Sequence, residues 1–273
     1  MVQRNSRSPA APMPMPTMGR INWGGLWVLC GRETLRFLKI GQQTIAGPMV
    51  TTLLFLAVFA LALGGTFREV GGRPFLEFLA PGLIVMAVMQ NAFANASSSL
   101  LSAKMTGNIV DLLMPPLAPG ELLTGFLVGG LARGLCVGLA VGLAMWVFVP
   151  IRLQDYLVLG YYVVAAALLM SLLGVLTGVW AEKFDHMSTI TNFVVTPLSF
   201  LSGTFYSIER LPEPFYTIIQ FNPFFYVIDG FRSSFIGHSD ANLGLGMALL
   251  AVINLGLLLW ALWMFQTGYR LKD

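Results

Sequence analysis

Residues 124–149 read TGFLVGGLARGLCVGLAVGLAMWVFV and are apolar for long enough to cross a lipid bilayer. A membrane-spanning helix needs roughly 20 consecutive apolar residues, because the hydrocarbon core is about 30 Å thick. Five further runs of this kind lie at 45–65, 79–101, 157–180, 189–207 and 243–265. Arg133 is the sole Lys, Arg, Asp or Glu inside the six runs. The sequence therefore predicts an all-α membrane protein with six transmembrane helices.

The composition excludes several other classes of protein. Of the 273 residues, 56% are apolar and 11% are charged, whereas a soluble domain carries about 25% charged residues. An ordinary soluble enzyme, a disordered chain and a nucleic-acid binder are therefore not expected. A membrane β-barrel is not expected either, because barrel strands alternate apolar and polar residues over about 10 positions.

Basic residues predict the orientation, because loops rich in Lys and Arg stay in the cytoplasm. One side of the predicted membrane carries Arg4, Arg7, Arg20, Arg32, Arg36, Lys39, Lys104, Lys183, Arg270 and Lys272. The other side carries Arg68, Arg73, Arg152, Arg210 and Arg232. Both termini are therefore predicted to be cytoplasmic, and the net charge of +3 reflects this bias.

The N-terminal part divides into a flexible Pro-rich leader at 1–19 and a helix at 20–44, followed by the transmembrane domain at 45–273. At 100° per residue, one face of this helix carries Trp23, Trp27, Cys30, Phe37 and Leu38, and the opposite face carries Arg32, Arg36 and Lys39. A basic face opposite an apolar one is typical of a helix lying in the membrane interface. The alternative is a helix packed on the rest of the protein; the interfacial interpretation is preferred.

The predicted cytoplasmic loops contain candidate contact residues. The residue pattern predicts a short amphipathic helix at 104–114, and Pro115-Pro116 ends it because consecutive prolines stop a helix. This helix either only connects two spans or docks its apolar side chains into a groove on a cytoplasmic partner. The next cytoplasmic loop, 182–186, is short and charged.

Two patterns lie inside the predicted spans. Gly130, Gly134, Gly138 and Gly142 follow a four-residue spacing, which indicates close helix packing along one face. Asn91, Asn95, Ser98 and Ser102 form one polar stripe, which either hydrogen-bonds to other helices or lines a pathway. The spans lack Asp, Glu and His, which proton- and ion-coupled carriers generally need.

The sequence shows no catalytic motif. It contains two His, no H-E-x-x-H, no G-x-S-x-G and no Gly-Lys pair, so a phosphate-binding P-loop is absent. Cys30 and Cys136 are interpreted as small packing residues, and neither a disulfide nor a metal site is expected. Any ATP hydrolysis would have to come from another chain.

The outer loop before the last span is rich in aromatic residues. Its apolar pieces, 213–220 and 223–236, are too short to span and predict an interfacial or re-entrant arrangement. The runs LSGTFY (201–206), LP (211–212), FNP (221–223) and DGFR (229–232) resemble the C-terminal signature of ABC-2 type transporter permeases. The signature positions are Gly203, Pro212, Asn222, Pro223, Asp229 and Arg232. The stretch from Asp111 to Pro116 is similar to the cytoplasmic segment of that family.

This resemblance implies the permease half of an exporter in a bacterial inner membrane. Two copies of the chain, a homodimer, would pair with two copies of a separate ABC ATPase that carries the ATP and Mg, so no cofactor is expected on this chain and it is not itself an enzyme. Substrates of the family include drugs, lipids and polysaccharides. The coupling residues implied are Lys104, Asn108, Ile109, Asp111, Leu112, Leu113, Glu182 and Asp185. The subunit interface of the family usually involves spans one and five, so the glycine face is assigned to packing within the chain. The alternative function is a channel or uncoupled carrier without an ATPase.

Overall fold

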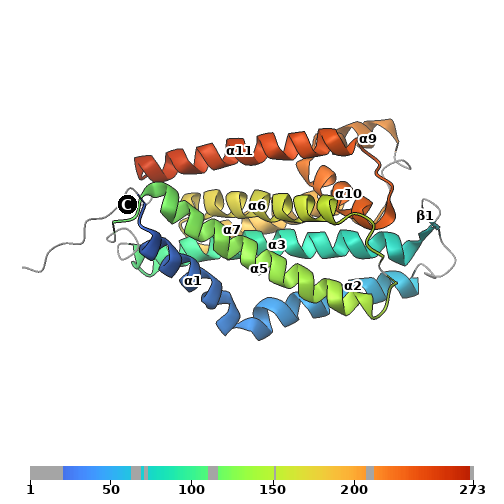
Figure 1. Ribbon diagram of the computed structural model, residues 1–273, viewed down its shortest axis with the longest axis horizontal. Coiled ribbons are helices and arrows are strands. Elements are labelled where there is room, and N and C mark those ends of the chain that lie inside the picture. The colour runs from blue at the N-terminus through green and yellow to red at the C-terminus, as the bar shows by residue number, and fades with distance from the viewer. Residues whose placement is uncertain are drawn as a thin grey trace, which may run out of the picture.

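The computed structural model describes residues 21–62, 69–70, 73–109, 116–150, 152–206 and 212–270. Long helices lie side by side and run between two ends of the molecule (Figure 1). One end holds α1 (Trp23–Lys39) and the C-terminal end of α11 (Leu243–Thr267), and is called the inner end because the sequence predicts it to be cytoplasmic. The other, the outer end, holds a small hairpin of β1 (Glu69–Val70) and β2 (Arg73–Pro74), together with α9 (Glu213–Gln220) and α10 (Pro223–Ile236).

Five helices in the described part of the chain are long and apolar enough to cross a membrane. They are η1–α2 (Gln42–Ala46 and Gly47–Ala62), α3 (Phe75–Met105), α5 (Pro119–Trp146), α6 (Tyr156–Trp180) and α11 (Leu243–Thr267). They coincide with five of the six predicted runs. The remaining run, 189–207, corresponds to three consecutive short elements: α7 (Phe184–Ile190), η2 (Thr191–Val195) and α8 (Thr196–Leu201). The sixth span therefore stays a prediction.

The core is organised around α3, which packs between α5 and α6. The glycine face of α5 meets α3 closely: an added Cβ at Gly134 would lie 3.0 Å from both the Ala92 Cβ and the Val88 carbonyl oxygen. Added Cβ atoms at Gly130 and Gly138 would overlap with the side chains of Ser171 and Val88. The glycine face thus serves packing within the chain.

A second glycine face, on α6, packs against α3 from another side. A Cβ added at Gly174 would lie 2.6 Å from the Phe93 carbonyl oxygen, and one at Gly178 would lie 3.0 Å from the Leu100 Cβ. Small residues let helix backbones approach closely, which increases van der Waals contact where apolar burial gives little drive in lipid. Glycines on two neighbouring helices therefore place α3 at the centre.

Two helices contain a π turn at the same register before a proline. The π turn η1 ends at Ala46 and Pro48 follows two residues later; η2 ends at Val195 and Pro197 follows likewise. Proline has no amide hydrogen and its ring clashes with the carbonyl four residues earlier, so a regular α-helix cannot pass through it without distortion. The π turns absorb this distortion.

The two short apolar pieces predicted in the outer loop are the helices α9 and α10, with the predicted boundaries. The Asn222 side chain caps α10 by accepting a hydrogen bond from the Phe224 amide at 3.1 Å. Gly237 ends α10 with a φ of 78°, a left-handed conformation that glycine adopts without strain. The existence of these helices is confirmed, whereas a re-entrant position in the membrane stays a prediction.

Candidate functional site

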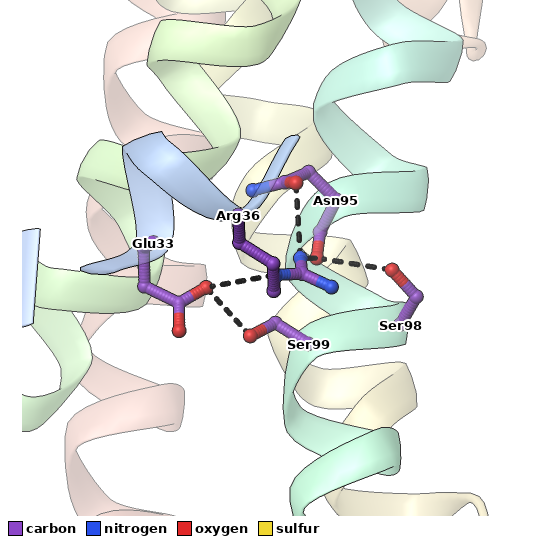
Figure 2. Close-up of polar contacts among 5 residues, drawn as sticks. All are labelled: Glu33, Arg36, Asn95, Ser98 and Ser99. Atoms are coloured by element: carbon purple, nitrogen blue, oxygen red, sulfur yellow. Dashed lines mark hydrogen bonds and ion pairs between the residues drawn. The ribbon is translucent and has the colours of Figure 1, made fainter. Parts of the chain in front are cut away.

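A buried polar cluster joins α1 to α3 near the inner end (Figure 2). The Arg36 Nη2 atom donates to the Asn95 backbone oxygen at 2.9 Å and to its side-chain oxygen at 3.0 Å. The Glu33 carboxylate lies 3.6 Å from the Arg36 Nε and accepts a hydrogen bond from the Ser99 hydroxyl at 2.6 Å. Figure 2 shows Asn95 and Ser99 contacting these side chains from the same helix, with Ser98 beside them bonded to the Asn95 backbone oxygen. We call Glu33, Arg36, Asn95 and Ser99 the α1–α3 clasp.

This clasp corrects the predicted basic face of α1. The helical periodicity places Arg36 on a solvent-facing basic surface with Arg32 and Lys39, but its guanidinium turns toward α3. Arg32 and Lys39 lie outside the core. Burial lowers the pKa of the Arg36 guanidinium, and the Glu33 carboxylate partly offsets that effect. The buried carboxylate of Glu33 lies beside the cation, which the sequence pattern alone did not indicate.

The α1 helix has two apolar faces. One carries Leu29 and Phe37 and is buried against the bundle; a Cβ added at Gly125 of α5 would overlap with the Leu29 side chain. The other carries Trp23 and Trp27, which are 69% and 81% exposed. The helix is thus packed on the protein, the alternative interpretation, and still presents indole rings outward, as an interfacial helix does.

The polar stripe of α3 makes hydrogen bonds between helices. Asn95 belongs to the α1–α3 clasp. The Asn91 side-chain oxygen accepts from the Arg133 Nη2 atom at 3.1 Å, so the one charged residue of the predicted spans is paired with α3. Ser98 donates weakly to the Asn95 backbone oxygen at 3.4 Å. The hydrogen-bonding interpretation therefore describes Asn91 and Asn95.

Asn91 also lines a groove of about 340 Å³ beside α3. The groove lies between η1–α2, one side of α3 and the η2–α8 segment. The π turn η2 contributes Thr191 and Val195 to its lining, and Pro48, two residues after η1, also lines it. Asn91 therefore both bonds to another helix and borders the groove, while a pathway along the stripe stays a prediction.

The inner end ties α1 to the start of α5. The Glu121 carboxylate accepts hydrogen bonds from the Asn22 amide at 2.7 Å and the Ala118 amide at 2.8 Å. Asn22 in turn caps α1, because its side-chain oxygen accepts from the Gly25 amide at 2.9 Å. Glu121 therefore fixes the N-termini of two helices to one another. We call Asn22, Ala118 and Glu121 the inner hook.

The predicted loop contacts lie at the same inner end, with different surroundings. Lys104 is the second-last residue of α3, and its ammonium donates to the Val179 and Ala181 carbonyls that end α6. The predicted helix at 104–114 thus begins inside α3, and the part beyond 109 lies outside the described residues. The same holds for Asp111, Leu112 and Leu113.

Four further predicted residues show what remains available for contact. Asn108 is exposed, whereas Ile109 packs against a cluster of buried apolar side chains that includes Leu122 and Phe126. Glu182 and Asp185 are exposed in the next loop, and the Glu182 carboxylate lies 3.9 Å from Arg270 of the C-terminal segment. The structure therefore brings both loops to one end but holds Lys104 in a helix-capping role.

At the outer end, the signature residues Arg232 and Gly203 form a buried cluster with Thr204 and Phe78. The Arg232 Nη2 atom donates to the Gly203 carbonyl at 2.6 Å and to the Thr204 carbonyl at 3.3 Å, and its guanidinium lies 3.8 Å from the centre of the Phe78 ring. Gly203 has a φ of 78°. Arg232 therefore joins α10, the end of α8 and the start of α3; we call Arg232, Gly203, Thr204 and Phe78 the outer lock.

The other signature residues shape the helices beside this lock. Asn222 donates to the Leu198 carbonyl at 3.1 Å, and Pro223 occupies the first turn of α10. Pro212 precedes α9 at its N-cap. Asp229 is buried and accepts the Asp240 and Ala241 amides at 2.9 and 3.0 Å, which holds the turn before α11. These contacts give the signature a structural role.

Comparison with known proteins agrees with this architecture. The model of the ABC-2 type transporter family matches residues 25–236. The chain belongs to the ABC-2 transporter family. It is 35% identical over 258 residues to the inner membrane transport permease YadH of Escherichia coli, covering 94% of this chain and 100% of that protein. It is 25% identical over 240 residues to nodulation protein J of Rhizobium leguminosarum bv. viciae, covering 86% and 90% of the two chains.

The family membership makes the chain a membrane transport permease of the inner membrane with several membrane-crossing helices. Permeases of this family generally pair with ABC ATPase subunits.

Cys136, interpreted from the sequence as a small packing residue, is exposed on α5.

Sequence reasoning missed the acidic members of the site. Glu33 lies among Arg and Leu in a helix whose pattern is basic, and Glu121 follows a Pro-Gly turn. A signal for Glu121 existed, since an acid in the first turn of a helix often bonds to the preceding amide groups. Nothing comparable identified Glu33, because its partner Ser99 is distant in sequence.

Proposed function

We propose that this chain is the membrane half of an ATP-driven exporter that moves an amphiphilic substrate outward through the inner membrane. Two copies would pair with two copies of a separate ABC ATPase, and both termini and the loops around 104–118 and 182–186 would face that ATPase. In this arrangement α7, η2 and α8 lie in the fifth of six spans, the predicted run 189–207. The helices α9 and α10 re-enter the membrane from outside.

The observation that carries the proposal is the connected inner end. The inner hook fixes α1 to α5, and the α1–α3 clasp fixes α1 to α3. A displacement applied to the loops at this end is therefore passed to α3, which borders the groove. ATP hydrolysis changes the shape of the partner, and the hook and clasp give that change a path into the membrane part.

The test is whether transport requires an ATPase partner. We expect an ABC ATPase to co-purify with this chain, and export of an amphiphile from inverted vesicles to stop when ATP is depleted. Export that persists without ATP and without an ATPase partner would instead establish the channel or uncoupled carrier.

Coupling can be tested at the predicted contact loop. Asp111→Lys, or Leu112→Asp with Leu113→Asp, should abolish capture of the ATPase while the protein still inserts in the membrane, because docking of a helix needs an apolar, correctly charged face. Arg152→Glu at the outer end is the matched control and should leave capture unchanged. Capture of the ATPase at full strength by the loop variants would contradict this assignment.

A further inference from the structure

The groove beside α3 is lined by uncharged polar side chains. Its polar members are Thr51, Thr52, Gln90, Asn91, Thr191 and Thr196, and the remainder of its lining is apolar. Among the described residues, no Asp, Glu, Lys, Arg or His belongs to the lining. A charged group entering this space would lose hydration without meeting an opposite charge, which is costly in a low-dielectric site.

The arginines that contact this part of α3 are already paired. Arg133 donates to the Asn91 side-chain oxygen at 3.1 Å, and Asn91 donates its own amide to the Ala87 carbonyl at 3.0 Å. Arg36 is held by Asn95 and by the Glu33 carboxylate. Neither arginine belongs to the lining of the groove, so neither places a positive charge directly at its surface.

Three of the four threonine hydroxyl groups in the groove lining donate to backbone carbonyls. Thr51 and Thr52 donate to the Gly47 and Pro48 carbonyls at 3.0 and 2.6 Å, and Thr191 donates to the Met187 carbonyl at 2.9 Å. A hydroxyl has a single proton to donate, so these oxygens offer the groove only acceptor lone pairs. The groove therefore favours a ligand that brings its own donors.

Gln90 differs from its neighbours, because its amide makes no hydrogen bond with any described residue. A primary amide offers two donors and two acceptor sites. Phe55 and Phe93 lie in the same lining and provide apolar contact. Resting on the proposed function, we infer that the groove receives the uncharged, hydroxyl- or amide-bearing part of the amphiphile, and that Gln90 is a specificity-determining residue.

The experiment measures protection of a thiol placed in the groove. Thr51→Cys is made with Cys30→Ser and Cys136→Ser, and the purified protein in neutral nanodiscs is alkylated with a maleimide. Four probes share a dodecyl chain: dodecyl β-D-glucoside, octa(ethylene glycol) dodecyl ether, dodecyl phosphate and dodecyltrimethylammonium. At equal content in the bilayer, the glucoside should slow alkylation about fivefold more than the ether, which brings a single hydroxyl, and more than either ion.

Variants of Gln90 separate specific binding from general partition into the bilayer. Gln90→Leu should remove most of the glucoside's advantage, and Gln90→Glu should shift protection toward the ammonium probe. Gln220→Leu, at an exposed position of α9, should change nothing. Equal protection by all four probes, strongest protection by an ion, or an unchanged pattern in both Gln90 variants would overturn the inference. No ATPase or ATP is present, so these results are independent of the test of ATP-driven export.

Discussion

The helices η1–α2 and α3 are both long and apolar, yet their surroundings are opposite. The mean hydropathy of the most apolar window is 2.2 in η1–α2 and 1.5 in α3, while 11% of the first window and 83% of the second are buried. The less hydrophobic helix is therefore the central one. Polar side chains such as Asn91 and Asn95 are tolerated in α3 because other helices hydrogen-bond to them, whereas a helix with few neighbours in the chain has fewer such partners.

The contrast extends to neighbouring elements. Two glycine faces bring α5 and α6 against α3, whereas η1–α2 presents Leu54, Val58 and Leu61 outward, exposed by 59% or more. The η2–α8 segment carries the second π turn and also presents an exposed side chain, Phe193, at 77%. The groove thus lies between the closely packed helix α3 and two elements with exposed side chains, η1–α2 and η2–α8.

The largest expected effect comes from breaking the central packing. Gly134→Leu places a side chain where a Cβ already meets Val88 and Ala92 at 3.0 Å. Separating α5 from α3 should cost about 1–3 kcal/mol or more and prevent a stable fold in detergent. Thermal unfolding by tryptophan fluorescence measures this. Gly256→Leu on α11 is the control, since no described atom lies within 4 Å of its Cβ position; equal melting of both variants would contradict the packing.

The next effect tests the outer lock. Arg232→Met leaves the Gly203 and Thr204 carbonyls without their buried donor. This should lower the free energy of unfolding by about 1–3 kcal/mol. Arg232→Lys should recover little, because an ammonium does not reproduce the stacking on Phe78. Arg152→Met, at an exposed position, should be neutral. A full recovery by lysine would show that charge alone matters there.

A smaller effect is expected at the α1–α3 clasp. Glu33→Gln and Arg36→Met should each destabilise the protein by about 1 kcal/mol. The double variant should cost less than the sum, because the two side chains are partners and their coupling is about 0.5 kcal/mol or more. Chemical unfolding in detergent of the unmodified protein, the two single variants and the double variant completes this double-mutant cycle. Strictly additive effects would mean that Glu33 and Arg36 contact α3 independently and not as one ion-paired cluster.

The smallest effect on stability is expected at the two π turns, η1 and η2. Pro48→Ala and Pro197→Ala restore an amide hydrogen behind each π turn, so the helices can close into regular α geometry. The free energy of unfolding should change by less than about 1 kcal/mol, while hydrogen exchange within 42–46 and 191–195 slows. If exchange in these segments is unchanged, the prolines are not the cause of the π turns.

Much of the helix layout could be predicted from composition and periodicity. Five spans and the short helices at 213–220 and 223–236 follow from the lengths of apolar runs between breakers. The four-residue spacing of glycines in α5 predicted close helix packing, because it places small residues on one face of the helix. The buried face of α1 could not be predicted: helical periodicity groups Phe37 with Trp23 and Trp27, but Phe37 is buried with Leu29 and the two Trp side chains are exposed.

The membrane class and the positions of five long helices could be derived from the chain alone, because they depend on local length, hydropathy and residue type. The signature residues were identified by resemblance to the family. The packing of the helices was needed to show that α3 is central, that Arg36 turns toward Asn95, and that Glu33 and Glu121 anchor α1. The partners of these side chains lie far apart along the chain. Burial of a charge depends on a counter-charge or donor brought by another helix, and that is a property of the fold.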